Sequence, residues 1–126
     1  MPDAHIAGAH DWGLVYLAAP YTHDDPKVRE ARFQAVNRTA ASLMAHGVRV
    51  FSPISHSHPI AQCGNLPDQW AFWREQDLPI LELCGRLVVL MLDGWTQSTG
   101  VQAEMAAATR RDIPIGFISP HPTIMW

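Results

Sequence analysis

The chain has little cysteine, a low content of charge and no long hydrophobic run. Its 126 residues include two cysteines, Cys63 and Cys84, which lack the spacing of metal ligands. We expect Cys84 to be a buried free thiol rather than half of a disulfide, because it lies in an apolar run and we expect a reducing compartment. Charged residues make up 17% of the chain and the net charge is -3, so no general field attracts nucleic acid or an anionic membrane.

No segment approaches the roughly 20 consecutive apolar residues that a transmembrane helix needs. The first residues, MPDAHIAGAHDWG, also lack the basic and then apolar layout of a signal peptide. We therefore expect a cytoplasmic protein without a membrane partner. No internal repeat, low-complexity tract or linker divides the chain, and its length predicts a single domain over residues 1–126.

Short apolar runs alternate with segments of helical periodicity. The apolar runs, which are typical of buried strands, cover residues 13–19, 48–51, 86–92 and 114–118. The helical segments cover residues 26–46 with Asp25 as the N-cap, residues 68–83 with a kink or break at Pro79, and about residues 101–110. Residues 52–67 predict a long polar loop, and the tail is expected to dock through Ile124 and Trp126.

This alternation predicts an α/β fold with a parallel sheet, because right-handed crossovers place helices on both faces. We expect a three-layer sandwich of the flavodoxin-like or Rossmann-like kind, with four or five parallel strands. In such sheets, ligands bind beside the carboxyl ends of the strands. Three loops follow those ends: APYTHDD at residues 19–25, SPISHSHP at residues 52–59 and DGWTQSTG at residues 93–100. These loops contain most of the polar side chains that lie outside the periodic segments of the chain.

The third loop leads into a helix start that suits an anion. Ser98 is a candidate N-cap, and the free N–H groups beside Thr99, Gly100 and Val101 could hold an anion such as a phosphate. Glu104 follows Ser98 by six residues and lies one turn inside the helix. A lone carboxylate there is usually a partner of the helix dipole, so spacing alone does not make Glu104 catalytic. Asp93 either reaches the ligand or caps the turn.

Histidines and tryptophans in these segments leave several interpretations open. His56 and His58 would point the same way in an extended loop, and with a third ligand they could bind a metal. No such partner stands nearby in the sequence, so we expect no metal and favour base recognition, a leaving-group role or a hydrogen-bonded loop. Trp70 and Trp73 stand at helical spacing and favour the core, whereas Trp95, between polar segments, favours the pocket.

Three motifs in a fixed order carry a resemblance to a known group of enzymes. They are VYLAAPY at residues 15–21, the region around Asp77, and the pattern S-x-G-x-x-x-E formed by Ser98, Gly100 and Glu104. Together they resemble the nucleoside 2-deoxyribosyltransferase-like superfamily over nearly the whole chain. The patterns YLA-PY, FSPI-HSHPI, W-FW and LMLDGW-S-G-E are similar to a branch of that superfamily without an assigned reaction.

The resemblance implies an enzyme of nucleotide metabolism, with residues 1–126 as one nucleoside 2-deoxyribosyltransferase-like domain. It would cleave the N-glycosidic bond of a (deoxy)nucleoside 5′-monophosphate or nucleoside, as the related N-glycosidases do, or transfer the sugar to another base. Within the matched motifs, Ala19, Pro20 and Gly100 would contact this small molecule. No cofactor and no nucleic acid polymer is implied. Relatives complete each site with residues of a neighbouring subunit, so a homodimer or homotetramer is expected.

The same resemblance implies roles for individual residues. Glu104 corresponds to a nucleophile that attacks the anomeric carbon, forms a covalent glycosyl intermediate and gives net retention. Asp77 would contact the sugar or help to protonate the departing base, and the Tyr16 hydroxyl would lie near Glu104. Ser98 has the spacing of the serine that binds the 5′-phosphate in nucleotide-cleaving relatives.

Other interpretations stay open. Asp77 could be a solvent-facing helix charge, and Tyr16 could be ordinary core. A non-catalytic nucleotide sensor would keep the phosphate-binding helix start without turning substrate over. A metal-dependent hydrolase would depend on His56 and His58. The identity of the base, the choice of ribose or deoxyribose, and the choice of water or nucleobase as acceptor are also left open.

Overall fold

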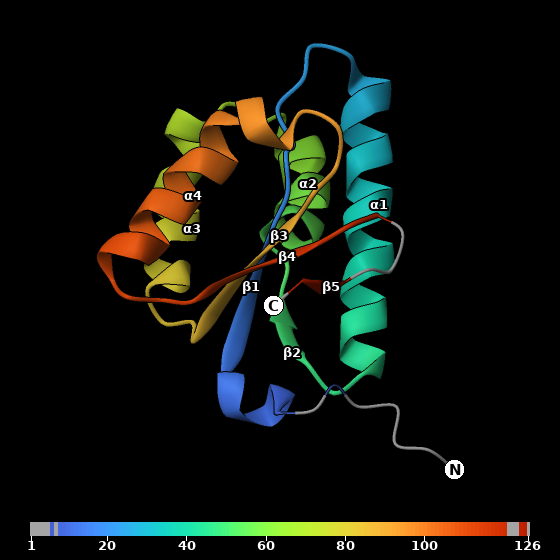
Figure 1. Cartoon of the computed structure of the whole chain (residues 1–126). Helices are drawn as coiled ribbons and strands as arrows, with labels where there is room; N and C mark the ends of the chain where they lie inside the picture. The colour runs from blue at the N-terminus through green and yellow to red at the C-terminus, as the bar shows by residue number, and fades with distance from the viewer. Residues whose placement is uncertain (1–5, 7, 121–123, 126) are drawn as a thin grey trace.

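The structure, a computed structural model, describes Ile6, residues 8–120 and residues 124–125. One sheet carries helices on both of its faces (Figure 1). The predicted three-layer sandwich of the flavodoxin-like or Rossmann-like kind is confirmed. Within the described ranges, no helix combines the length and the apolar character that crossing a membrane requires.

Four parallel strands and one antiparallel strand form the sheet. They are β1 (Leu14–Ala18), β2 (Arg49–Phe51), β3 (Arg86–Leu90), β4 (Ile115–Ile118) and β5 (Ile124–Met125). Their order is β2-β1-β3-β4-β5, and β5 runs antiparallel to β4. The tail therefore docks at Ile124 by strand pairing, opposite Ile118. Trp126, the other residue expected to dock, lies outside the described residues.

Helix α1 covers one face of the sheet with α2 packed beside it, while α3 and α4 cover the other face (Figure 1). The helices are α1 (Pro26–Ala45), α2 (Pro53–Gly64), α3 (Trp70–Leu81) and α4 (Thr99–Arg110), with short 3-10 helices η1 (Ala9–Trp12) and η2 (Trp95–Gln97). Two hydrophobic clusters fill the two interfaces. The buried Cys84 thiol lies in the second cluster and is free, as predicted.

Strand β1 contributes to both clusters. From Val15 to Ala18 its apolar sequence is buried on both faces, as a central parallel strand requires. Val15 and Leu17 belong to the cluster under α1, whereas Tyr16 and Ala18 belong to the cluster under α3 and α4. Because alternate side chains of a strand point to opposite faces, Tyr16 is turned toward α3 and α4.

The predicted polar loop at residues 52–67 is wrong, because most of this segment forms α2. Pro53 occupies the first turn, where a missing N–H costs little, and Asn65 ends the helix in the left-handed conformation with φ of 51°. Pro59 lies inside the helix despite its low helix propensity. Packing against α1 and β1 outweighs the turn-forming composition that misled the prediction.

The other helix predictions hold with shifted ends. Asp25 caps α1 as predicted, and its side chain accepts from the Lys27 N–H at 2.9 Å. Helix α3 runs through Pro79 and ends at Leu81, so of the predicted kink or break at Pro79, the break is wrong. A proline two residues before a helix end removes only one backbone hydrogen bond. Helix α4 begins at Thr99, slightly earlier than the sequence predicts.

Candidate active site

A cavity of about 610 Å³ opens at the carboxyl ends of β1, β2 and β3. Its wall combines the loop after β1, part of α2, the part of α3 from Trp70 to Asp77 and the start of α4. The chain leaves β1 for β2 on one side and returns to β3 on the other side. The cavity therefore lies at the topological switch point of the sheet, and its volume is typical of small-molecule sites.

Most of the predicted site residues meet at this cavity. Those in its wall are Ala19, Pro20, His58, Asp77, Ser98, Gly100 and Glu104. Tyr16 reaches the same place through its contact with Glu104. His56, Asp93 and Trp95 are not part of the wall.

Tyr16 and Glu104 form a buried hydrogen-bonded pair. The Tyr16 hydroxyl donates to Oε2 of Glu104, and the two residues are 0% and 4% exposed. Burial raises the pKa of Tyr16, and the charges of Glu104 and Asp77 raise it further, so the phenol keeps its proton. Glu104 lies in the second turn of α4, beyond the first turn, where carboxylates usually pair with the helix dipole.

Asp77 faces this pair from α3. It is 8% exposed, so the alternative of a solvent-facing charge is wrong. Burial raises the pKa of Asp77 to about 6. Burial also raises the pKa of Glu104 to about 8; the Tyr16 hydrogen bond opposes this shift, and the charge of Asp77 adds to it. The site thus contains two carboxyl groups with different pKa values, an arrangement that can separate the roles of acid and base.

The start of α4 has the N-cap that the sequence predicts. Oγ of Ser98 accepts from the Val101 N–H at 3.2 Å, which makes Ser98 the N-cap. The expectation that the Val101 N–H is free for an anion is therefore wrong. The N–H groups of Thr99 and Gly100 belong to the first turn, where no intrahelical acceptor exists. A Cβ at Gly100 would lie 3.3 Å from Cε3 of Trp70, so the missing side chain lets the indole pack on this helix start.

The tryptophans are placed opposite to the prediction. Trp70 and Trp73, expected in the core, lie in the cavity wall. Trp95, expected in the pocket, packs 5.6 Å from Phe117 between ring centroids and joins the cluster under α3 and α4. Helical spacing identifies one face of α3, but it does not tell whether that face meets the sheet or the cavity.

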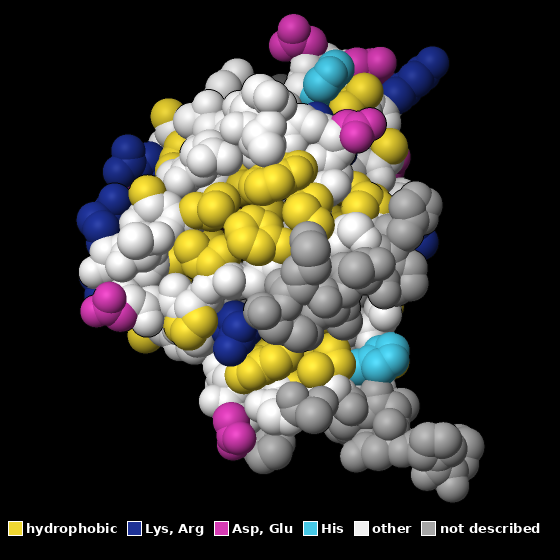
Figure 2. Space-filling view, viewed as in Figure 1, with side chains coloured by type: hydrophobic (Ala, Val, Ile, Leu, Met, Phe, Trp, Pro, Cys, Tyr) yellow, Lys and Arg dark blue, Asp and Glu magenta, His cyan; other side chains and the backbone are white. Residues whose placement is uncertain are grey.

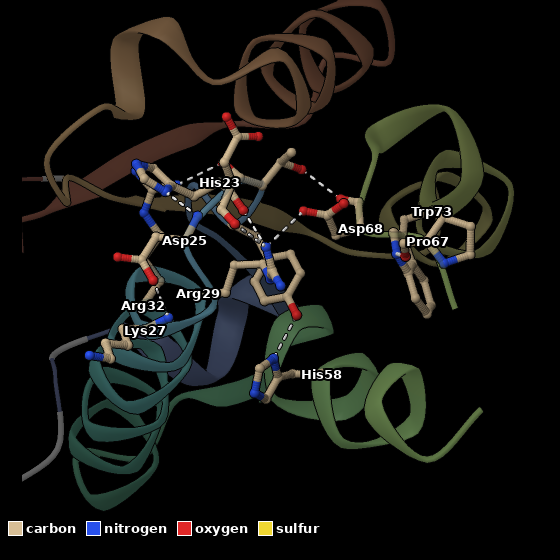
Figure 3. Close-up of polar contacts among 12 residues, drawn as sticks. His23, Asp25, Lys27, Arg29, Arg32, His58, Pro67, Asp68 and Trp73 are labelled. Atoms are coloured by element: carbon tan, nitrogen blue, oxygen red, sulfur yellow. Dashed lines mark hydrogen bonds and ion pairs between the residues drawn. The ribbon is translucent and has the colours of Figure 1, made fainter. Parts of the chain in front are cut away.

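Two arginines of α1, which the sequence did not single out, connect the loops around the cavity (Figure 3). Arg32 donates to the backbone oxygens of Thr22 at 3.0 Å and Asp93 at 3.2 Å, and thereby joins the loops after β1 and β3. Asp93 thus contributes its carbonyl, while its side chain is not in the wall. Arg29 lies 3.5 Å from the Asp68 carboxylate. Their spacing of three residues on one helix face was the available signal.

His56 and His58 do not point the same way, so that prediction is wrong. The segment is helical, and residues two apart do not share a helix face. His58 is 4% exposed and stacks on Phe33 at 4.3 Å, whereas the exposed His56 lies 6.0 Å from Phe51 between ring centroids. Among the residues that the structure describes, no three or more His, Cys, Asp or Glu side chains gather as metal ligands would.

A solved structure of a 2-deoxyribosyltransferase from the psychrotolerant bacterium Bacillus psychrosaccharolyticus is similar in fold. That enzyme is described as a suitable biocatalyst for the synthesis of antiviral and antitumoral nucleosides. The TM-score is 0.60 at 21% sequence identity, and the match covers 90% of this chain and 77% of that chain. No curated protein matches the chain.

A family model described as a domain of unknown function, DUF1937, matches residues 13–119. This span includes the four parallel strands and helices α1 to α4. It also includes the whole wall of the cavity and the buried pair of Tyr16 and Glu104. The chain therefore belongs to the DUF1937 family.

Proposed function

We propose that this protein is a single-domain enzyme of the nucleoside 2-deoxyribosyltransferase-like superfamily, acting on the N-glycosidic bond of a (deoxy)nucleoside 5′-monophosphate or nucleoside. The observation that carries the proposal is the buried cluster of Tyr16, Asp77 and Glu104 beside the cavity. Retaining glycosyl transfer uses a pair of carboxyl groups, one as the nucleophile and the other as the acid and then the base. The likeness in fold to a 2-deoxyribosyltransferase supports this class of reaction.

Glu104 is the nucleophile in the first step. Tyr16 occupies Oε2 of Glu104, which leaves Oε1 to attack the anomeric carbon of the sugar. As the bond from Oε1 to that carbon forms, the bond from the carbon to the base nitrogen breaks, and its electron pair goes to the base. Protonated Asp77 supplies a proton to the departing base. The step yields a glycosyl ester of Glu104 and a free base.

Water or a second nucleobase resolves the ester. Ionised Asp77 takes a proton from the attacking group as its oxygen or nitrogen bonds to the anomeric carbon. The ester bond breaks, and Glu104 leaves as a carboxylate. Two successive inversions at that carbon give net retention. Hydrolysis and transfer therefore share the same residues and differ only in the acceptor.

The shifted pKa values define the protonation state of the cluster. With values of about 6 for Asp77 and about 8 for Glu104, the pair holds one proton between these two values. These values place that proton mainly on Glu104, so the reactive form, with the proton on Asp77 and the charge on Glu104, is the minor of the two arrangements. The Tyr16 hydrogen bond favours the ionised form of Glu104. Neutral pH falls within the interval in which one acid and one carboxylate coexist.

Incubation with a panel of nucleosides and 5′-monophosphates, followed by chromatography of the free bases, tests the proposal. Base release that withstands a chelator is the expected result. If no member of the panel loses its base, the proposed reaction is wrong.

A 5′-phosphate at the start of α4 is part of the proposal, and Ser98→Asp tests it. Aspartate is a strong N-cap, so the acceptor for the Val101 N–H is kept while a negative charge is added. We expect kcat/KM for a 5′-monophosphate to fall by at least about tenfold through charge repulsion, and kcat/KM for the matching nucleoside to stay within about threefold. Ser98→Thr, which keeps the hydroxyl, is the control. An equal loss for both substrates would contradict a phosphate site here.

The proposal also includes assembly as a homodimer or homotetramer. Figure 2 shows hydrophobic side chains gathered on one face of the molecule, and apolar surface of this kind often marks an interface. Light scattering during size-exclusion chromatography should then give two or four times the chain mass of 14.0 kDa. A single species of the chain mass at micromolar concentration would contradict the assembly.

A further inference from the structure

Tyr21 and His58 in the wall of the cavity form a polar array with Glu30 behind them, and the proposed reaction steps do not use it. The Tyr21 hydroxyl lies 2.6 Å from Nδ1 of His58, and Nε2 of His58 lies 3.5 Å from Oε1 of Glu30. Figure 3 shows the contact that reaches His58 at Nδ1. Tyr21 and His58 both line the cavity that contains Glu104.

The imidazole of His58 is held in one orientation. It is buried, and its ring stacks on Phe33 of α1 with centroids 4.3 Å apart and planes inclined by 28°. Glu30 also belongs to α1, and Gln34 donates to its second carboxylate oxygen at 3.1 Å. The ring is therefore fixed between α1 and the loop after β1, with one nitrogen toward Glu30 and the other toward Tyr21.

The charge of Glu30 determines which ring nitrogen carries the proton. Nε2 is buried and has no hydrogen-bond partner at normal distance, so the facing carboxylate acts on it mainly through charge. A lone pair on Nε2 would be repelled by that carboxylate, whereas an N–H would be attracted. The neutral ring therefore carries its proton on Nε2, and Nδ1 accepts the hydrogen bond from the Tyr21 hydroxyl.

The Tyr21 hydroxyl keeps its proton and donates a hydrogen bond to His58. Burial raises the pKa of Tyr21, and Asp68 and Glu30 raise it further against the opposing charge of Arg29. A phenol has one O–H donor, and the Tyr21 O–H is already engaged in the hydrogen bond to Nδ1 of His58. The Tyr21 oxygen can therefore meet a ligand only as an acceptor. A ligand carbonyl at the same place would meet lone pairs and make no hydrogen bond.

We propose that this array selects substrates that present a hydrogen-bond donor to the Tyr21 oxygen. Tyr21 is then a specificity-determining residue, while His58 and Glu30 are positioning residues. The inference rests on the proposed function for the substrate class, a nucleoside or its 5′-monophosphate. The donor is an N–H of the base or an O–H of the sugar, and the experiment distinguishes these two sources.

The first measurement is the protonation pattern of His58 by long-range proton–nitrogen NMR at neutral pH. The wild-type protein is expected to show a protonated Nε2 and an unprotonated Nδ1. Glu30→Ala should shift the ring toward a mixture of the two tautomers, because the charge that selects between them is removed. Glu82→Ala removes an exposed carboxylate outside the cavity wall and should leave the pattern unchanged.

The second measurement is ligand binding by calorimetry in a Glu104→Gln background, where the ligand is not consumed. One pair of purine nucleosides differs only in the 6-amino group, and further pairs differ in one sugar hydroxyl. We expect Tyr21→Phe to weaken the donor-bearing ligand about tenfold, as for one lost hydrogen bond, and to change its donor-free partner less than about twofold. The pair that shows this difference identifies the donor.

The outcomes separate this inference from the proposed reaction. A wild-type His58 protonated on Nδ1, or an equal loss for both members of every pair, overturns the inference and leaves the reaction standing. Selective loss in Tyr21→Phe without base release from any substrate overturns the reaction and leaves the inference standing. Failure of every nucleoside and monophosphate to bind overturns both.

Discussion

Glu104→Gln should abolish the release of free base. We expect the rate to fall roughly 10³-fold or more, as is typical when an enzyme loses its nucleophile. Glutamine has nearly the shape of glutamate, and its amide oxygen can still accept from the Tyr16 hydroxyl. The packing of α4 is therefore kept. The amide cannot form the glycosyl ester on which the proposed reaction depends. Chromatography of free base from nucleosides and 5′-monophosphates, with a chelator present, measures the effect.

Glu82→Gln provides a matched control for this substitution. Glu82 follows α3, pairs with Arg111 at 3.0 Å and lies outside the cavity wall, so this variant should keep its activity. The rival functions give other patterns. A nucleotide sensor binds ligand in both forms and releases base in neither, and a metal-dependent hydrolase loses activity to the chelator. Full activity of Glu104→Gln would show that Glu104 is not the nucleophile.

The same substitution should make the protein more stable at alkaline pH. The pKa of Glu104 is raised to about 8 in the folded state, mainly by burial, so the folded protein holds a proton there that the unfolded chain releases. Between the ordinary pKa of a glutamate and about 8, the folded state binds more protons, so wild-type stability falls as pH rises. The glutamine side chain of the variant does not titrate. We expect the stability of the variant relative to wild type to grow by several kcal/mol from pH 5 to pH 8.

Urea unfolding at a series of pH values measures this difference. Asp77→Asn serves as a second variant, since burial raises the pKa of Asp77 only to about 6. Its advantage over wild type should therefore be nearly complete by about pH 7, whereas that of Glu104→Gln continues to grow. A constant difference between Glu104→Gln and wild type over this range would mean that Glu104 is already ionised in the folded protein at pH 5.

The main elements of the fold are predictable because their signals are local. The apolar run of β1, the cap at Asp25 and the cap at Ser98 act through residues within one or two turns. Helix α2 is not predictable in this way. Its sequence contains Pro59 and turn-forming residues, and its stability comes from packing on α1 and β1. Contacts of that kind are not visible in a window of neighbouring residues.

In the candidate site, too, some residues could be predicted from the sequence and others could not. Ser98 could be singled out as an N-cap from its local position, whereas Glu104 was singled out through the resemblance, and its catalytic role stays a prediction. Trp70 was expected in the core because helical periodicity identifies a face but not its partner. Trp95 was expected in the pocket from its polar neighbours, but it packs on Phe117. Arg32 was missed because its contacts are the backbone oxygens of two distant loops.

By itself, the sequence determined the alternation of strands and helices, and with it the edge of the sheet at which polar residues collect. Only the tertiary structure decided which of those residues meet. Tyr16 and Glu104 are 88 positions apart, and Tyr21 and His58 are 37 apart. Backbone periodicity is set by neighbours along the chain, whereas the raised pKa values of Asp77 and Glu104 arise mainly from burial that forms only when α3 and α4 close over β1.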